Sequence, residues 1–166
     1  MRLRVAVPED AETLLGLMRE GFEGYRSFAP AGWEPEMPPV ERYAERLAAP
    51  TTFCLVAEDD GAAAGHVGFL PTELAGHPDA APGLAHLWQL FVRPAYWGTG
   101  LAAELLGRAV EEARTRGFDG MRLYTPAGQA RARRFYEREG FAVVGGRVDE
   151  RLVLEIVEYR RGLVRP

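Results

Sequence analysis

Apolar residues in the first third of the chain follow first a strand-like and then a helix-like spacing. Residues 3–7 alternate between apolar and polar, which predicts a short strand. Pro8-Glu-Asp10 can start the helix that follows, whose apolar face carries Leu14, Leu15, Met18 and Phe22. An irregular stretch over 24–39 then leads to a second helix with the apolar face Val40, Tyr43, Ala44 and Leu47. We therefore expect one strand followed by two helices.

The middle of the chain is typical of β-structure. Apolar runs over 52–58 and 63–70 flank Asp59-Asp-Gly61, a sequence suited to a hairpin turn, so the two runs should pair as antiparallel strands. A loop over 71–83 follows. Residues 84–92 are then apolar on both faces, which predicts a strand at the centre of a sheet.

The last part of the chain mixes helices and strands. Apolar residues recur at helical spacing over 98–116, and Gly117-Phe118 is typical of a helix C-cap. A strand over 120–125, a helix over 127–139 and a hairpin of 142–148 with 151–159 complete the pattern. This order predicts a single α/β domain over 1–166, with a mixed, mostly antiparallel sheet of about seven strands and about four helices.

Composition narrows the class of protein. With 47% hydrophobic residues among 166, the chain can bury one sizeable core. Its net charge of −4 provides no concentrated basic field, so we expect no nucleic-acid partner. The first ten residues lack the apolar segment of a signal peptide, and no run approaches the ~18 apolar residues of a membrane span. We therefore expect a cytoplasmic protein without a membrane segment.

The cysteine and the histidines do not form a metal-binding pattern. Cys54 lies in an apolar run and should be a buried thiol, since it has no second cysteine with which to form an internal disulfide. His66 and His86 lie in predicted strands and His77 in a loop rich in Gly and Pro, without the spacing of metal ligands. We expect no metal.

Chemistry is concentrated in residues 90–106, a buried strand that passes through a glycine-rich turn into a long helix. Gly98 and Gly100 allow a tight turn, and the free N–H groups of the first helical turn then point outward at the positive end of the helix dipole. Such an arrangement binds a pyrophosphate. Residues 98–103 also fit the G-x-G-x-x-A dinucleotide fingerprint, but Thr125-Pro126 ends the next strand where that motif needs an acidic residue.

Two motifs at the proper spacing resemble the GCN5-related N-acetyltransferase (GNAT) superfamily, and the resemblance covers nearly the whole chain. The first is the family's valine, proline loop and x-x-G-x-G/A pattern, found here as Val92, Pro94, Trp97, Gly100 and Ala102. The second is Gln129-Ala-Arg-Ala-Arg-Arg-Phe-Tyr-Glu-Arg-Glu-Gly-Phe141. The resemblance implies a GNAT-like fold whose splayed central strands form a slot for acetyl-CoA.

The resemblance also implies which residues contact the cofactor. The pyrophosphate would lie on the backbone amides of Trp97, Gly98, Thr99, Gly100, Leu101, Ala102 and Ala103. The pantetheine arm would pair like an extra strand with the backbone of Leu90, Phe91 and Val92. Trp97 stands where the family usually has Arg or Gln, and Gln129 stands where it usually has Asn, with an amide that still reaches the cofactor.

Tyr136 and His86 are the catalytic residues that the resemblance implies. Family members use the tyrosine to protonate the departing CoA thiolate, and a phenol of pKa ~10 can supply a hydrogen bond or a proton to a thiolate of conjugate pKa ~8.5. The alternative is that Tyr136 packs beside Phe135 on the apolar face of its helix. His86 stands where many members have a glutamate base, and even spacing places it on the same strand face as Leu90 and Val92. An imidazole of pKa ~6.5 suits removal of a proton from an ammonium, directly or through water, while a histidine that is simply hydrogen-bonded at a strand edge fits this position equally well. The implied mechanism is direct transfer in a ternary complex.

The acceptor of the acetyl group stays open. The first two helices and their loop wall the acceptor pocket in this family, and here they offer Phe22, Tyr25, Phe28 and Trp33 interleaved with Glu23, Glu34 and Glu36. Aromatic faces beside carboxylates suit an amine, whereas the same residues could equally cap the core and face water. A small amine, an amino-acid derivative, an aminoglycoside-like compound and a protein N-terminus all fit. A non-catalytic acyl-CoA sensor is the alternative, and a homodimer through the C-terminal hairpin is compatible with the fold.

Overall fold

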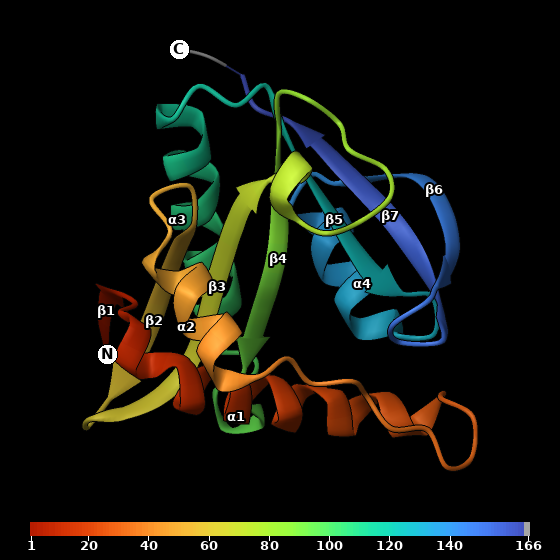
Figure 1. The fold of residues 1–166 in the computed structure, drawn as a ribbon, viewed down its shortest axis with the longest axis horizontal. Helices are drawn as coiled ribbons and strands as arrows, with labels where there is room; N and C mark the ends of the chain where they lie inside the picture. Colours follow the sequence, from red (N-terminus) through yellow and green to blue (C-terminus); the bar gives the residue numbers. More distant parts are fainter. Residues whose placement is uncertain (165–166) are drawn as a thin grey trace.

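The computed structural model describes residues 1–164, which form one seven-stranded sheet with the order β1-β2-β3-β4-β5-β7-β6 (Figure 1). The strands are β1 (Arg2–Val5), β2 (Phe53–Asp59), β3 (Ala62–Pro71), β4 (Leu84–Val92), β5 (Gly120–Pro126), β6 (Ala142–Asp149) and β7 (Leu154–Gly162). All neighbouring strands are antiparallel except β4 and β5. The predicted mixed, mostly antiparallel sheet is thus confirmed.

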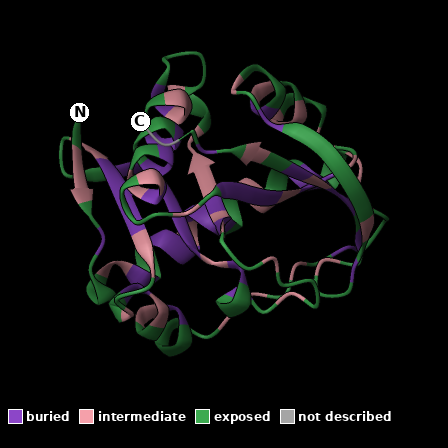
Figure 2. Cartoon of the chain, turned by 90° about the horizontal axis from the view of Figure 1, so that it is seen from above, coloured by how far each residue is buried: buried purple, intermediate pink, exposed green. Residues whose placement is uncertain are grey.

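Helices cover both faces of the sheet (Figure 1). They are α1 (Ala11–Glu23), α2 (Val40–Ala48), α3 (Leu101–Thr115) and α4 (Ala130–Arg138). One apolar core joins the sheet to α3 and α4, and a second joins its other face to α1 and α2. Figure 2 shows the buried residues concentrated in the central strands, while β6 at the edge is mostly exposed.

The hairpin turn between β2 and β3 forms as predicted. Asp60 has a φ of 48° and Gly61 a φ of 79°, and two successive left-handed residues are what a two-residue hairpin turn requires. The terminal hairpin differs from the prediction, because β7 begins at Leu154 and not at residue 151. The Asp149 carboxylate accepts backbone N–H groups from Arg151 (3.0 Å) and Leu152 (2.8 Å), and these bonds hold the intervening residues in a loop.

The central strands β4 and β5 diverge. They pair only where Leu84–Leu87 lie beside Gly120–Leu123. Beyond that point β4 continues to pair with β3 as far as Val92, and β5 continues to pair with β7 as far as Pro126. The second half of β4 therefore presents an unpaired edge toward β5, which confirms the predicted splay of the central strands.

A β-bulge in β4 reverses which face its side chains occupy. The register between β3 and β4 shifts so that Gly68 lies opposite Gln89 but Phe69 lies opposite Leu87, which leaves Trp88 as the extra residue. Before the bulge Leu87 belongs to the core under α3; after it, Leu90 and Val92 pack against that same core. An extra residue inverts the period-2 alternation of a strand.

The bulge corrects one prediction. His86 lies between two residues of the α3-side core, so its side chain faces the α1 side, opposite to Leu90 and Val92. The expectation from even spacing that these three residues share a face is therefore wrong. Even spacing requires regular alternation through Trp88, whereas the pairing with β3 breaks it there.

Candidate active site

A cavity of about 850 Å³ is lined from both faces of the sheet where β4 and β5 diverge. On one side it is bounded by the starts of α3 and α4, and on the other by the end of α1, the short 3-10 turn Gly24–Ser27 and the loop near Asp149. It brings together the predicted site residues His86, Leu90, Phe91, Val92, Trp97, Gly98, Gly100, Leu101, Ala102, Ala103, Gln129 and Tyr136. Thr99 does not line it.

The glycine turn has the geometry of an anion site. Gly98 and Gly100 have φ values of 78° and 88°, in the left-handed region that favours glycine, and Gly100 is the N-cap of α3. The amides of Ala102 and Ala103 have no hydrogen-bond acceptor among residues 1–164, because the first bond into the helix is from Glu104 N to Gly100 O at 3.0 Å. Free N–H groups therefore meet the positive end of the α3 dipole at the cavity.

Thr99 stabilises this turn from behind. Its hydroxyl donates to the Tyr96 carbonyl at 2.6 Å and lies 3.4 Å from the Leu101 amide. The side chain is thus used inside the loop, which explains why Thr99 is absent from the cavity wall. Any cofactor contact by this residue would be limited to its backbone.

Trp97 joins three parts of the site. Its indole N–H donates to the Val92 carbonyl at 2.9 Å, which ties the glycine turn to the end of β4. The guanidinium carbon of Arg131, on α4, lies 3.7 Å from the centroid of the Trp97 ring, a cation–π contact. The Arg131 guanidinium therefore places a positive charge at position 97, where the family usually has Arg or Gln, but this charge comes from α4.

Sequence reasoning missed a row of arginines on α4. Arg131, Arg134 and Arg138 are spaced so that they share one helix face, and all three line the cavity. None of them has an ion-pair partner among the described residues, although Glu139 also lines the cavity. Their i, i+3, i+7 spacing in the sequence predicts a basic face on this helix, which the comparison with the family motif did not consider.

Tyr136 is on the buried side of α4 and is 9% exposed. Its ring contacts those of Phe135 and Phe141. Its hydroxyl makes no hydrogen bond with the described part of the chain, and the residue lines the cavity. Burial raises its pKa, and the nearby Tyr25 raises it further. Tyr136 is therefore a protonated donor at neutral pH.

Gln129 is the N-cap residue of α4 and lines the same cavity. Its side-chain oxygen accepts a hydrogen bond from the Thr125 hydroxyl at 3.3 Å. That contact leaves the amide NH₂ free to donate, since the bond uses only the oxygen.

His86 has a different environment from the one predicted for a base. The residue is 4% exposed, and its Nδ1 lies 3.2 Å from the Nε of Arg122. A guanidinium can only donate, so Nδ1 accepts and the proton of the neutral ring is on Nε2. Burial lowers the His86 pKa well below its usual value, with His77, Arg122 and Arg46 adding to the effect. The lone pair that a base would use is occupied, and the role of base stays a prediction.

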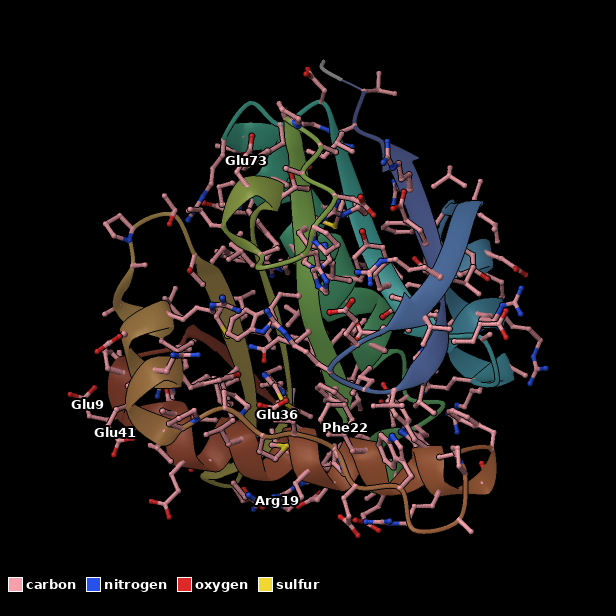
Figure 3. The ribbon with its side chains drawn as sticks, turned by 45° about the vertical axis from the view of Figure 1, so that its right-hand side comes forward. Glu9, Arg19, Phe22, Glu36, Glu41 and Glu73 are labelled. Atoms are coloured by element: carbon pink, nitrogen blue, oxygen red, sulfur yellow. The ribbon has the colours of Figure 1, made fainter. Side chains whose placement is uncertain are left out.

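Only some of the aromatic residues predicted to wall the acceptor pocket line the cavity. Phe22, Tyr25 and Phe28 line the cavity, and Figure 3 shows Phe22 on the side of α1 that faces the sheet, opposite Arg19. Trp33 lies behind them, with its indole N–H donating to the Leu152 carbonyl at 2.6 Å.

The three glutamates predicted beside these rings do not line the cavity. Glu23 and Glu34 form ion pairs with Arg26 at 2.8 and 3.1 Å, and Glu36 is exposed. The aromatic wall is therefore present without the predicted interleaved carboxylates, because Arg26 draws two of them onto the outside of the loop.

The remaining histidine and the cysteine lie away from the cavity. His66 is fully buried in β3 with its ring stacked on Phe91 at 5.6 Å, and Cys54 is a buried thiol that accepts from the Gln89 amide at 3.5 Å. Within residues 1–164 no three His, Cys, Asp or Glu side chains are grouped so that they could hold a metal ion. None of the helices described combines the length and apolarity needed to cross a membrane.

Comparison with known proteins connects this geometry to a family. Residues 18–141 match the family described as Acetyltransferase (GNAT) family. Over 67 residues the chain is 43% identical to a mycothiol acetyltransferase of Beutenbergia cavernae, and this match covers 40% of the chain. It spans 22% of that relative, so most of the longer protein has no counterpart in the alignment.

Solved structures share the fold. A ribosomal-protein-alanine N-acetyltransferase from Brucella melitensis superposes with a TM-score of 0.76 at 22% identity, covering 98% of this chain and 100% of the other. A PaiA N-acetyltransferase from Thermoplasma acidophilum, in complex with coenzyme A, gives 0.74 at 18% identity over 98% and 99% of the two chains. At such identities the likeness concerns the fold alone.

Proposed function

Because the chain belongs to the acetyltransferase (GNAT) family, we propose that it transfers an acetyl group from acetyl-CoA to a primary amine, directly and within a ternary complex. The observation that carries the proposal is the continuity of the cavity. It extends from the glycine turn at the start of α3, past Tyr136, to the opposite face of the sheet. Cofactor and amine can therefore approach the same point from two sides.

The proposed cofactor site begins at the glycine turn. The pyrophosphate lies against the free amides of the first turn of α3, where the helix dipole favours a negative charge. The arginine row of α4 (Arg131, Arg134 and Arg138) lines the same cavity and supplies charges for the phosphate groups. The amide of Gln129 adds a donor on this side.

The pantetheine arm occupies the gap between the diverging strands. The edge of β4 over 88–92 is not paired with β5, so its backbone groups are available to an extended ligand. The Val92 carbonyl is the exception, because it already accepts from Trp97. Leu90 and Phe91 then contact the pantetheine arm. Phe91 does so through its backbone, because its ring packs against the core beneath α1.

Tyr136 is the proposed general acid. Its hydroxyl is protonated, free of protein hydrogen bonds within residues 1–164, and faces the cavity between the cofactor side and Tyr25. When the amine attacks the thioester carbonyl, the C–N bond forms and the C–S bond breaks. The sulfur then takes the Tyr136 proton as it leaves, and the tyrosinate recovers a proton that the amine has released to solvent.

Two measurements test the proposal. Thermal unfolding with acetyl-CoA and with NAD compares the two cofactors: ligand at about 100 times its Kd should add roughly 2.7 kcal/mol of stability. We expect acetyl-CoA alone to raise the Tm. A thiol-release assay with a panel of primary amines then measures transfer. Stabilisation by NAD alone would overturn the proposal.

A non-catalytic acyl-CoA sensor is the second candidate, and the occupied lone pair of His86 favours it. Such a protein would gain stability with acetyl-CoA but release no thiol with any amine. An enzyme without a side-chain base instead shows transfer that rises with pH up to the pKa of the amine, because only the neutral amine attacks. The pH profile of thiol release therefore separates the two.

A further inference from the structure

Two imidazoles lie together at the end of the cavity opposite the glycine turn. His77, from the loop before β4, and His86, in β4, have ring centroids 4.9 Å apart, and both line the cavity. The ring of Tyr124, in β5, contacts them at 4.7 and 5.3 Å. We call these three residues the two-histidine subsite.

Each imidazole is fixed as a hydrogen-bond donor toward the cavity. The Nη2 of Arg147 lies 3.1 Å from Nδ1 of His77, and the Nε of Arg122 lies 3.2 Å from Nδ1 of His86. Arginine has no acceptor, so both Nδ1 atoms accept and both Nε2 atoms carry the proton. Neither Nε2 has a hydrogen-bond partner among residues 1–164, so both N–H groups are free to donate to a ligand.

The charge behind the subsite is positive and incompletely balanced. Arg122 is fully buried, no carboxylate lies within 4.0 Å of it in the described part of the chain, and its Nη2 has no hydrogen-bond partner. Its guanidinium lies 5.0 Å from the centre of the Tyr124 ring, and that of Arg147 lies 5.1 Å away. A buried cation without a counter-ion is costly, so an anion nearby would stabilise it.

Three carboxylates are near, those of Asp149, Asp79 and Glu158, and none of them forms an ion pair with Arg122; Glu158 is paired with Arg160 at 2.7 Å. Asp149 lines the cavity: its Oδ1 is held by two backbone N–H groups, and its Oδ2 lies 3.9 Å from Arg147 and 4.0 Å from His77. The Asp79 side chain, 64% exposed, lies 3.9 Å from Arg147, while Arg122 bonds only its backbone carbonyl. Asp79 and Glu158 still attract the Arg122 charge through space, whereas Arg46 and Arg151 add positive potential at the histidines.

We propose that the two-histidine subsite binds a carboxylate of the acetyl acceptor, so that the acceptor is an α-amino acid whose amine points back toward the gap between β4 and β5. The inference rests on the proposed function, since it names the class of amine. Phe22, Tyr25 and Phe28 line another part of the same cavity, which favours an apolar or aromatic side chain on that amino acid. The carboxylate takes both Nε2–H donors and offsets the charge of Arg122.

Binding tests the subsite without any catalytic turnover. Isothermal titration of the CoA-saturated protein compares N-acetyl-L-phenylalanine and N-acetyl-L-leucine with their carboxamides, which differ only in the charge of that end. We expect each acid to bind at least tenfold more tightly than its amide. Equal affinity of acid and amide, or no binding of either acid, overturns the inference.

Matched variants assign the effect to the histidines. His77→Gln and His86→Gln keep a side chain that can accept from arginine and donate to the cavity, whereas His77→Leu and His86→Leu remove the donor at similar volume. The acid-to-amide ratio should fall below threefold in each Leu variant and stay within threefold of wild type in each Gln variant. Circular dichroism checks the fold of each variant, and the wild-type comparison stands even if a Leu variant unfolds.

Turnover separates this inference from the proposed function. Thiol release is measured with L-phenylalanine, L-phenylalaninamide and phenethylamine, which share an amine and an aromatic ring. Preference for the amino acid by tenfold or more in kcat/KM supports the subsite. Equal use of all three amines leaves the acetyltransferase intact and overturns the subsite. Failure of acetyl-CoA to bind would overturn the proposed function, while the titration, repeated without CoA, would still decide the subsite.

Discussion

The guanidinium carbon of Arg131 lies 3.7 Å from the centroid of the Trp97 ring, so that a charge carried by α4 stands over the turn that starts α3. This contact joins the two helices whose ends border the cofactor side of the cavity. The Arg or Gln side chain that the family usually has at position 97 is absent here, and the guanidinium of Arg131 from another helix lies at that place.

Removing Arg131 should weaken CoA binding. Arg131→Ala loses a charge near the phosphates and the stacking that orders Trp97, and we expect Kd to rise about tenfold, roughly 1.4 kcal/mol. Isothermal titration with CoA at two salt concentrations measures it, and the variant should show the weaker salt dependence. Arg108→Ala is the control, because Arg108 is exposed on α3 away from the cavity. A similar loss in both variants would point to net charge and not to a site.

Tyr136 and Tyr159 form a matched pair for the chemistry. The Tyr136 hydroxyl has no hydrogen bond within residues 1–164, so Tyr136→Phe should lower kcat about 100-fold with little change in Tm. The Tyr159 hydroxyl donates to Glu137 at 2.9 Å and accepts from Arg133 at 3.0 Å. Tyr159→Phe should therefore cost about 1–2 kcal/mol of stability while largely keeping kcat. Unchanged turnover in Tyr136→Phe would remove the acid role.

Two glycines near α3 should respond in opposite ways to alanine. Gly100, with a φ of 88°, would be strained by a Cβ, so Gly100→Ala should cost about 1–2 kcal/mol and weaken CoA binding. Gly107 lies inside α3, and a methyl group added there would meet no atom within 4 Å outside the helix's own backbone. Gly107→Ala should gain about 1 kcal/mol of helix stability and leave binding unchanged. Urea unfolding and CoA titration of both variants measure these effects.

His66 should make stability fall at mildly acidic pH. Burial lowers the pKa of His66 to about 3, and both ring nitrogens are buried without a partner among the described residues. Its folded-state pKa lies below the unfolded value of ~6.5, so the unfolded state binds the extra proton. Stability is therefore complete above pH ~6.5 and declines as the pH falls toward 3, by about 2 kcal/mol at pH 5.

The variant His66→Leu isolates this contribution. Burial also lowers the pKa of His77 and of His86, so the wild type loses stability from three groups of the same sign. The free energy of unfolding is measured with urea at pH 7.5 and at pH 5.0, because most carboxylates stay ionised between these two values. The loss between the two pH values should be about 2 kcal/mol smaller in the variant, and equal losses would mean that His66 is protonated without cost in the folded protein.

The sequence predicts the fold well because its signals are local. The helical spacing over 101–115, the Gly98–Gly100 turn and the hairpin at Asp60-Gly61 each depend on residues adjacent in the chain. The face of His86 could not be predicted, because the bulge at Trp88 arises from pairing with β3. The neighbourhood of His77 and His86 was equally hidden, since it depends on where a loop and a distant Arg147 lie in space.

The bulge at Trp88 has a consequence for how such an enzyme can diversify. Before it, β4 directs His86 toward the α1 face of the sheet; after it, the same strand directs Leu90 and Val92 toward the α3 face. Under the proposed function, substitutions before the bulge would alter the acceptor side of the cavity, while the backbone edge after it would stay available to the acyl donor. One extra residue thus lets a single short strand serve different parts of the cavity on the two faces of the sheet.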